Sequence, residues 1–250
     1  MGRIDINREF NKIEAPVVCF DNVSKKYDDN TEALSDVSFN IFKGEFVFVV
    51  GDSGSGKSTM IKMILKETVP SSGKVFVIGH DTKRLRRKVV SKFRRSLGVV
   101  FQDFRLLKDR DVFENVAFAQ RVIEADTESM RQKVTKMLDL VGLSDKVRAY
   151  PKELSGGQQQ KVAMARALVN NPVILLADEP TGNLDPTSSR EIMHLLEEIN
   201  KRGTTVVVVT HNQEIVDKMQ KRVIVLNNGR IIRDEAKGGY DGGKNETGIY

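Results

Sequence analysis

The sequence predicts an α/β protein with a mainly parallel central sheet, and three observations lead to that fold class. Short apolar stretches alternate with helical ones along most of the 250 residues, which is typical of parallel strands joined by helices. The stretch FVFVV at 46–50 is apolar throughout, as expected of a strand that is covered on both faces. A glycine-rich loop follows this strand and opens a helix, the position at which such sheets bind their ligands.

The elements before the loop are predicted to be strands. Residues 1–16 are polar and charged, and we expect a flexible arm there. From residue 17 strand patterns appear, and in one of them Val37, Phe39 and Ile41 alternate with other residues before a Lys-Gly turn at 43–44. This alternation predicts a strand with one buried face.

After the loop, helices and strands are expected in alternation. The expected helices cover 57–66, 111–123, 126–143, 158–169, 189–203 and 213–220, and the expected strands lie within 73–79, 96–102, 172–180, 204–211 and 222–232. Asp126 or Thr127 is placed to cap the third of these helices. Residues 238–250 are rich in glycine and lack periodicity, so we expect a flexible tail.

The composition restricts the possible settings of the protein. The net charge of +6 and the pI near 9.3 favour an acidic partner such as nucleotide, nucleic acid or an anionic membrane face. A single cysteine, Cys19, rules out an internal disulfide framework and fits a reducing compartment. No apolar run approaches the roughly 20 residues of a spanning helix, and the N-terminus lacks the apolar core of a signal peptide. We therefore expect a cytoplasmic protein.

The glycine-rich loop at 51–58 is the strongest chemical signal. It fits the P-loop pattern G-x-x-x-x-G-K-[ST], after a buried strand and at the start of a helix. Its backbone N–H groups would converge on phosphate oxygens, Lys57 would bridge the β- and γ-phosphates, and Ser58 would ligate Mg²⁺. The nucleotide-binding residues expected here are Gly51, Ser53, Gly54, Ser55, Gly56, Lys57, Ser58 and Thr59.

Two carboxylates end a later apolar strand. Asp178 and Glu179 follow VILLA at 173–177, and the ends of such strands face the ligand crevice. Asp178 is placed to hold Mg²⁺ through water, and Glu179 to act as general base on the attacking water. Alone, such a pair is more often a solvated loop or a helix cap. The P-loop favours the catalytic interpretation.

Three weaker candidates need support from other motifs. Gln102 ends one strand and would reach the metal and the attacking water, and His211 ends another and would contact the γ-phosphate. Tyr27 precedes a strand and would stack on adenine. From its own context, each is as easily structural: a lone glutamine or histidine usually is, and a half-buried surface tyrosine is common.

The stretch LSGGQ at 154–158 opens a predicted helix. Ser155 suits the N-cap position, and a cap followed by a tight turn explains it together with one glycine. Two glycines, Gly156 and Gly157, weaken a helix unless something approaches the backbone closely. Their amides favour an oxyanion as the approaching group.

Together these motifs resemble those of the ATP-binding-cassette (ABC) ATPases, in the same order and over roughly 17–237. The loop 51–59 is similar to the family's Walker A motif, 173–179 to its Walker B strand, LSGGQ to its signature, and 183–185 to its D-loop. Tyr27, Gln102 and His211 fall where the aromatic residue, the Q-loop and the H-loop belong. The resemblance therefore strengthens the roles of these three residues.

The resemblance implies a P-loop NTPase of the ABC ATPase type. Its nucleotide-binding domain at 17–237 would have a mainly parallel core sheet, an antiparallel β subdomain and an inserted α-helical subdomain at about 105–170. The cofactors would be ATP and Mg²⁺. The expected catalytic residues are Lys57, Gln102, Glu179 and His211, and the expected metal ligands are Ser58, Gln102 and Asp178.

The resemblance also implies a homodimer with two composite ATP sites. In this family the signature of one subunit contacts the ATP that the other subunit holds. Ser155, Gly156, Gly157 and Gln158 would serve that contact, and Asp185 would communicate across the interface.

A finer resemblance, at 99–119, 177–185 and 226–240, is to the family's cell-division branch. It implies an ATPase on the cytoplasmic face of a bacterial plasma membrane, with an integral membrane partner and an output in peptidoglycan hydrolysis. The partner would dock on apolar residues that could equally be helical core: Phe104, Leu106, Leu107, Val112 and Phe113. The basic segment 82–96 could lie near anionic lipid, or it could be a solvated flank, as most charge runs are.

Two alternatives remain open at this stage. One is the ATPase subunit of a lipoprotein, macrolide or amino-acid transporter, since DEPTGNLD is shared with such ATPases. The other is a soluble ABC protein that acts on nucleic acid. It is disfavoured because the chain carries one cassette without a long coiled-coil insertion, and its basic residues lack interleaved aromatics. No nucleic-acid partner is expected.

Overall fold

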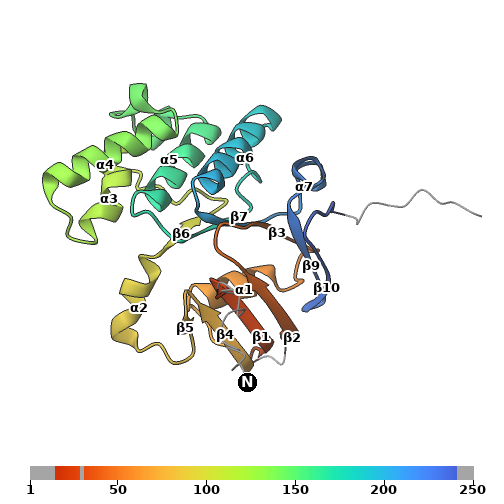
Figure 1. The fold of residues 1–250 in the computed structure, drawn as a ribbon. Coiled ribbons are helices and arrows are strands. Elements are labelled where there is room, and N and C mark those ends of the chain that lie inside the picture. The colour runs from red at the N-terminus through yellow and green to blue at the C-terminus, as the bar shows by residue number, and fades with distance from the viewer. Residues whose placement is uncertain (1–14, 29–30, 241–250) are drawn as a thin grey trace, which may run out of the picture.

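The computed structural model describes residues 15–28 and 31–240, and two sheets organise them (Figure 1). Most of the predicted N-terminal arm and of the predicted tail, residues 1–14 and 241–250, lies outside the described part. The smaller sheet has the strand order β2-β1-β4-β5, and every pairing in it is antiparallel. Its strands are β1 (Val18–Lys26), β2 (Glu32–Ile41), β4 (Ser72–Val77) and β5 (His80–Asp81).

The larger sheet is parallel except at one edge. Its order is β10-β9-β3-β8-β7-β6, and only β10 runs antiparallel to its neighbour. Its strands are β3 (Phe46–Val50), β6 (Leu97–Val100), β7 (Ile174–Asp178), β8 (Thr205–Val209), β9 (Arg222–Asn227) and β10 (Arg230–Glu235). The predicted α/β class, with a mainly parallel core sheet and an antiparallel subdomain, is confirmed.

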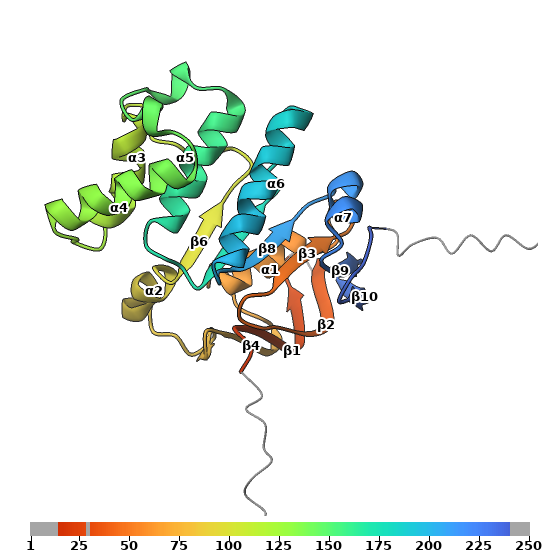
Figure 2. The same ribbon diagram turned by 45° about the horizontal axis from the view of Figure 1, so that its top comes forward.

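The helices cover both faces of the parallel sheet. They are α1 (Lys57–Ile64), α2 (Arg87–Arg94), α3 (Val112–Arg121), α4 (Thr127–Leu140), α5 (Gly156–Leu168), α6 (Pro186–Lys201) and α7 (Gln213–Met219), with 3-10 turns at Ser144–Lys146 and Pro151–Glu153. α3, α4 and α5 gather above the sheet next to α6, while α1 lies below it with the antiparallel strands (Figures 1 and 2). The inserted helices thus form a group of their own on one face.

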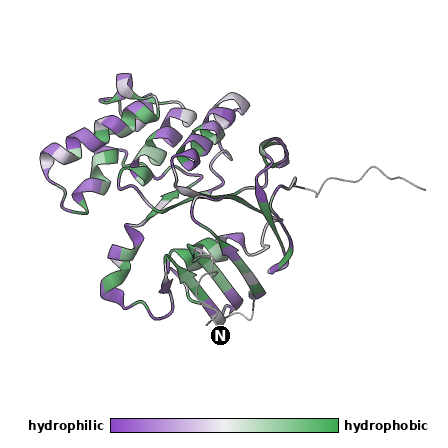
Figure 3. Cartoon of the chain, in the orientation of Figure 1, coloured by the Kyte–Doolittle hydropathy of each residue, from purple (hydrophilic) through white to green (hydrophobic). Residues whose placement is uncertain are grey.

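Strand β3 shows why the parallel sheet has two cores. All five of its residues are buried. Phe46, Phe48 and Val50 face the core formed with α3–α6, whereas Val47 and Val49 face the core formed with α1 and the antiparallel sheet. Because successive side chains of a strand point to opposite faces, a strand covered twice must be apolar throughout, as FVFVV is. In Figure 3 the strands of the antiparallel sheet carry alternating green and purple bands, as expected of strands with one buried face.

The start of α6 differs from the sequence-based expectation for an identifiable reason. α6 begins at Pro186, three residues earlier than expected, because Asp185 caps it by accepting from the N–H groups of Thr187 and Ser188. Asp126, the first of the two predicted caps, caps α4 by accepting from Ser129 N–H at 2.9 Å.

Cys19 lies half-buried on β1. No helix in the described part of the chain combines the length and apolar character that crossing a bilayer requires.

Candidate nucleotide site

The P-loop runs from the end of β3 to the start of α1, as predicted, and both backbone conformation and close packing restrict two of its residues to glycine. Gly51 and Gly56 have φ values of 146° and 109°, which side chains rarely adopt. A Cβ on Gly51 would lie 2.0 Å from the carbonyl oxygen of Leu226, and one on Gly56 would lie 2.5 Å from that of Ala33. The packing of the loop against neighbouring backbone therefore imposes glycine at both positions.

The N-terminus of α1 is open toward the loop. Gly56 is its N-cap, no side chain caps it, and its first turn holds no acidic residue. The Lys57 ammonium curls back over the loop and donates to the carbonyl oxygens of Gly51 and Asp52, both at 2.7 Å. Burial lowers the pKa of Lys57, although Glu179, Asp52 and Asp178 act in the opposite direction. A positive helix end and a lysine held by loop carbonyls favour an anion here.

Strand β7 delivers the two predicted carboxylates to the same edge. Burial, and then repulsion from Glu179, raises the pKa of Asp178, against the attraction of Lys57. Glu179 has a left-handed φ of 48°, and its N–H donates to the Val209 carbonyl at 2.8 Å. The parallel pairing of β7 with β8 therefore holds the backbone of Glu179 in a conformation that is costly for a non-glycine residue.

His211 follows β8 and meets Glu179. Its Nδ1 lies 2.7 Å from Glu179 Oε1, and 69% of the His211 side chain is exposed against 17% for Glu179. Two residues that are 32 positions apart in the sequence are thus adjacent at the carboxyl ends of neighbouring strands. Because the His211 imidazole contacts only Oε1 of Glu179, the other carboxylate oxygen can interact with a substrate.

Gln102 follows β6 and is linked to the loop after β7. Its side-chain amide donates to Asn183 Oδ1 at 3.3 Å, and the Asn183 amide donates to the Gln102 carbonyl oxygen at 3.1 Å. The sequence placed Asn183 in a D-loop without any contact to Gln102. Nothing in the sequence indicates this pairing, because it depends on the order of strands in the sheet.

Tyr27 lies beside α1. Its hydroxyl is 3.3 Å from Thr59 Oγ1, and Lys25 Nζ stands 5.0 Å from the centre of its ring. The predicted adenine-stacking residue is therefore next to the first turn of the helix that carries Lys57 and Ser58. Thr59 itself is buried in α1.

The signature stretch contacts the D-loop and α6 of its own chain. Ser155 caps α5 as predicted, and Gln158 returns the hydrogen bond in a capping box. A Cβ on Gly156 would lie 3.2 Å from Leu184 Cδ2, and one on Gly157 would lie 2.7 Å from Ser188 Oγ. Leu184 and Ser188 are thus the groups that lie close to the two glycines within the chain. The sequence predicted an oxyanion as the group that approaches them. No hydrogen bond among the described residues joins 155–158 to the P-loop.

Arg166 was missed by the sequence analysis. It lies half-buried on α5 and donates to the carbonyl oxygens of Arg105 and Phe104 at 2.7 and 2.9 Å. Both of those residues have left-handed φ values, 49° and 57°. Burial lowers the pKa of Arg166. An arginine in the otherwise apolar run VAMARALV was the available signal for a buried hydrogen-bonding role.

The proposed docking residues divide into core and surface. Val112 belongs to the core, and Leu106 and Phe113 pack against it, so the alternative interpretation is correct for Val112. Phe104 and Leu107 are half-buried. The large exposed apolar residues of this segment are Phe118 (47%) on α3 and Val122 (53%) at its C-cap, which the sequence did not single out.

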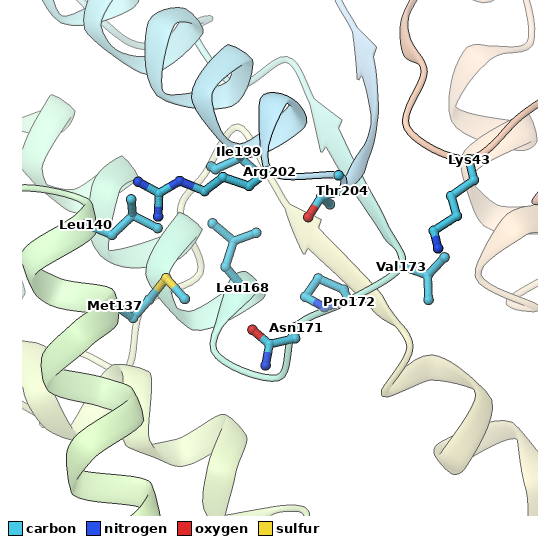
Figure 4. Close-up of a pocket in the computed structure, with 11 residues that line it drawn as sticks. Lys43, Met137, Leu140, Leu168, Asn171, Pro172, Val173, Ile199, Arg202 and Thr204 are labelled. Atoms are coloured by element: carbon cyan, nitrogen blue, oxygen red, sulfur yellow. The ribbon is translucent and has the colours of Figure 1, made fainter.

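Two cavities lie at opposite ends of the strands of the parallel sheet. One of about 260 Å³ is lined by Glu179, Gly182, Leu184 and His211 among others, and it belongs to the site described above. A larger cavity of about 490 Å³ lies where β7 and β8 begin, between α4, α5 and α6 (Figure 4). Because site residues follow the carboxyl ends of the strands, this larger cavity is separate from them.

These residues fit a polyphosphate and a divalent cation. The uncapped end of α1 and Lys57 offer positive charge. Asp178, with its raised pKa and its neighbour Glu179, is a carboxylate that a cation would stabilise. Gln102 and Ser58 add neutral oxygens of the kind that hard cations accept.

Comparison with known proteins gives the family. The family model described as "ABC transporter" matches residues 34–182, more than half of the chain. The chain belongs to the ABC transporter family. It is accordingly an ABC ATPase, which binds and hydrolyses ATP, and the confirmed fold agrees with that membership.

The relatives of this ABC ATPase are similar over nearly the whole chain. Proteins named "Cell division ATP-binding protein FtsE" are 52% identical over 218 residues in Bacillus subtilis (87% of this chain, 96% of the relative) and 51% over 222 residues in Streptococcus pneumoniae (88% and 96%). The protein of that name from Escherichia coli is 44% identical over 215 residues (86% and 97%).

Two solved structures share the fold of this ABC ATPase. A dimeric, post-hydrolysis structure of the ATP-binding cassette MJ0796 bound to ADP and Pi is 39% identical, with a TM-score of 0.79, and covers 89% of this chain and 100% of that one. CbiO1 from Clostridium perfringens, part of the ABC transporter complex cbiONQ, is 33% identical with a TM-score of 0.84 and 89% coverage of both chains.

Proposed function

We propose that this ABC ATPase is the ATP-hydrolysing subunit of a cell-division complex, bound at the cytoplasmic face of the plasma membrane to an integral membrane protein of the FtsX type. The observation that carries the proposal is the identity of about half over 87–88% of the chain with relatives named FtsE. The output would be control of peptidoglycan hydrolysis outside the cell, driven by opening and closing of an ATPase dimer.

Hydrolysis would depend on the pair Glu179 and His211. Glu179 accepts a proton from the attacking water, which requires one free carboxylate oxygen within hydrogen-bond reach. His211, at 2.7 Å from the other oxygen, fixes the rotamer of Glu179 and contacts the terminal phosphate from its exposed side. Lys57 turns from the loop carbonyls of Gly51 and Asp52 to the β- and γ-phosphates.

Mg²⁺ is the proposed metal, held by Ser58, Gln102 and Asp178. When bound, it neutralises charge on the transferred phosphoryl group. Burial and the neighbouring Glu179 raise the pKa of Asp178, and a dication beside the carboxylate would act in the opposite direction. Two hydrogen bonds join Gln102 to Asn183, so a movement of Gln102 toward the metal would also move Asn183.

The working unit is proposed to be a homodimer with composite sites. Within one chain Gly156 and Gly157 lie against Leu184 and Ser188, and no hydrogen bond among the described residues joins 155–158 to the P-loop. ATP on the P-loop would therefore meet Ser155, Gly156, Gly157 and Gln158 of a second copy. Asp185, which caps α6 beside these glycines, would sense that contact, and the dimeric relative MJ0796 supports the arrangement.

The membrane partner is proposed to dock on the outer face of α3. Phe118 and Val122 are four positions apart, so they share one face of the helix, and about half of each is exposed. They follow the loop 103–110 that leaves Gln102. A partner seated there would be connected through that loop to the metal ligand.

Co-purification from native membranes tests the proposed function. The wild-type chain should retain an FtsX-type protein, identified by mass spectrometry, and Phe118→Asp with Val122→Asp should lose it. Ile232→Asp, at an apolar residue that is 63% exposed on β10, is the matched control and should retain it. Recovery of a transporter permease in its place would reject the cell-division assignment.

A further inference from the structure

The region around α2 carries a dense, exposed positive charge. Between Thr82 and Gln102 the sequence contains no acidic residue. Eight cations in this stretch are exposed, and we call them the basic α2 surface: Lys83, Arg84, Arg86, Arg87, Lys88, Lys92, Arg94 and Arg95. Only Arg84 has an acidic partner among the described residues, Asp81 at 3.3 Å. Most of these cations are therefore available to an anionic partner outside the chain.

An apolar groove adjoins these cations, and Lys92 lines it. It has a volume of about 280 Å³ and is lined by Ile78, Leu85, Val89, Phe93 and Lys92 together with His80 and Ser96. Val89 is 43% exposed, while Phe93 is buried and meets the edge of the His80 ring. A groove of this size accepts a few methylene groups. The surface thus combines cations with an aliphatic floor.

The basic α2 surface adjoins the proposed partner face. Arg95 at the end of α2 donates to the carbonyl oxygen of Val122 at 3.2 Å, next to the exposed side chains of α3. α2 itself projects from the body beside β6 (Figures 1 and 2). If a membrane protein occupies Phe118 and Val122, the basic α2 surface is beside it.

We infer that the basic α2 surface binds the anionic headgroups of a phospholipid bilayer, with an apolar part of the lipid in the groove at Val89. Exposed cations without acidic partners attract an anionic membrane, and Val89, an exposed aliphatic residue among them, favours insertion at the interface. Nucleic acid is the weaker fit, because the segment 78–96 has no tyrosine or tryptophan and its one phenylalanine is buried. The inference rests on the proposed function in one respect only: a membrane partner seated at Phe118 and Val122 would turn the basic α2 surface toward the bilayer.

Sedimentation of the full-length chain with protein-free vesicles tests this inference. Vesicles of phosphatidylcholine with added phosphatidylglycerol should bind the chain, and vesicles of phosphatidylcholine alone should not. Arg87→Gln, Lys88→Gln and Lys92→Gln together should weaken binding about 100-fold, since each basic residue near an anionic surface contributes about fivefold. Val89→Ser should weaken it about fivefold through the lost apolar contact.

The matched control removes the same charge elsewhere. Arg131→Gln, Lys133→Gln and Lys136→Gln on α4 are exposed, and they have no described ion pair. This variant should bind nearly as well as the wild type, and both triple variants should retain ATPase activity as evidence of folding. Equal loss in both variants, or equal binding to neutral vesicles, would overturn the inference. Tight binding of DNA without vesicle binding would instead assign the surface to nucleic acid.

The outcome is independent of the proposed membrane partner. The vesicles contain no protein, so vesicle binding can succeed or fail whether or not an FtsX-type protein is recovered from membranes. Failure of co-purification with retained vesicle binding would reject the proposed function alone.

Discussion

At the scale of single residues, the site depends on side chains held by backbone in unusual conformations. Glu179, Phe104 and Arg105 all have left-handed φ values, and each is fixed by hydrogen bonds from another part of the chain. Strain of this kind costs of order 1–3 kcal/mol for each residue. The surrounding packing must supply that energy, so residues that provide it are sensitive positions even when they contact no ligand.

The first prediction concerns Glu179. Glu179→Gln keeps the size of the side chain and removes its basicity, so ATP hydrolysis should fall by about 100-fold or more while ATP binding persists. Size-exclusion chromatography with ATP should then show an accumulated dimer. Glu124→Gln, at an exposed carboxylate for which no hydrogen bond is described, is the control. Wild-type turnover in Glu179→Gln would refute its role as general base.

The second prediction concerns Arg166. Arg166→Met keeps the aliphatic length and removes both donors to the carbonyls of Phe104 and Arg105, which should reduce the free energy of unfolding by about 1–3 kcal/mol. Urea denaturation measures this. Arg166→Lys should recover part of the loss, because an ammonium can bond one of the two carbonyls but lacks the planar fork. Arg131→Met, at an exposed site, should change stability by no more than about 0.5 kcal/mol.

At the scale of elements, α5 and α6 meet through glycine. Gly157 lies directly against Ser188, and Gly156 lies against the flexible end of Leu184. Asp185 lies between Leu184 and Ser188 in the sequence and caps α6. Hydrogen bonds from Ser188 lower the pKa of Asp185. The two glycines thus set how closely the signature helix approaches the D-loop.

The third prediction follows from that contact. Gly157→Ala should destabilise the protein by about 1–2 kcal/mol, because overpacking against Ser188 exceeds the gain in helix propensity. Gly156→Ala should be nearly neutral or slightly stabilising, since Leu184 Cδ2 can move aside. In a Ser188→Gly background the cost of Gly157→Ala should disappear, and a thermodynamic cycle by urea denaturation measures the coupling. An unchanged cost there would show that Ser188 is not the obstacle.

Most elements could be predicted because their patterns are local. The P-loop strand and helix and the Ser155 and Asp126 caps depend on neighbouring residues, whereas the stretch 222–232, expected to hold a strand, divides into the antiparallel pair β9 and β10. The contacts of Gln102 with Asn183 and of Arg166 with 104–105 could not be predicted, because they join segments that only the tertiary fold brings together. The same reason hides the contact of Gly157 with Ser188, so the sequence assigned close approach to a ligand alone.

At the scale of the whole molecule, the order of strands brings the site together. Gly51, His211 and Gln102 follow β3, β8 and β6, Asp178 is the last residue of β7, and these four strands are adjacent in the sheet order β3-β8-β7-β6. Their carboxyl ends share one edge because all four strands are parallel. The sequence could predict that such an edge exists but not that the strand at 73–79 belongs to the other sheet, since both kinds of strand are short and apolar.

The last prediction tests the proposed dimer as a unit. Lys57→Ala removes the P-loop lysine and Ser155→Arg blocks the signature, so each variant alone should be inactive if both groups act at one composite site. In a mixed dimer one site pairs an intact Lys57 with an intact Ser155 from the other subunit. Random mixing at equal amounts should therefore restore about a quarter of the wild-type ATPase rate if the two sites act independently. No recovery at any ratio, with mixed dimers demonstrated by differently tagged chains, would contradict the composite site and place the function of the signature within its own chain, at Leu184 and Ser188.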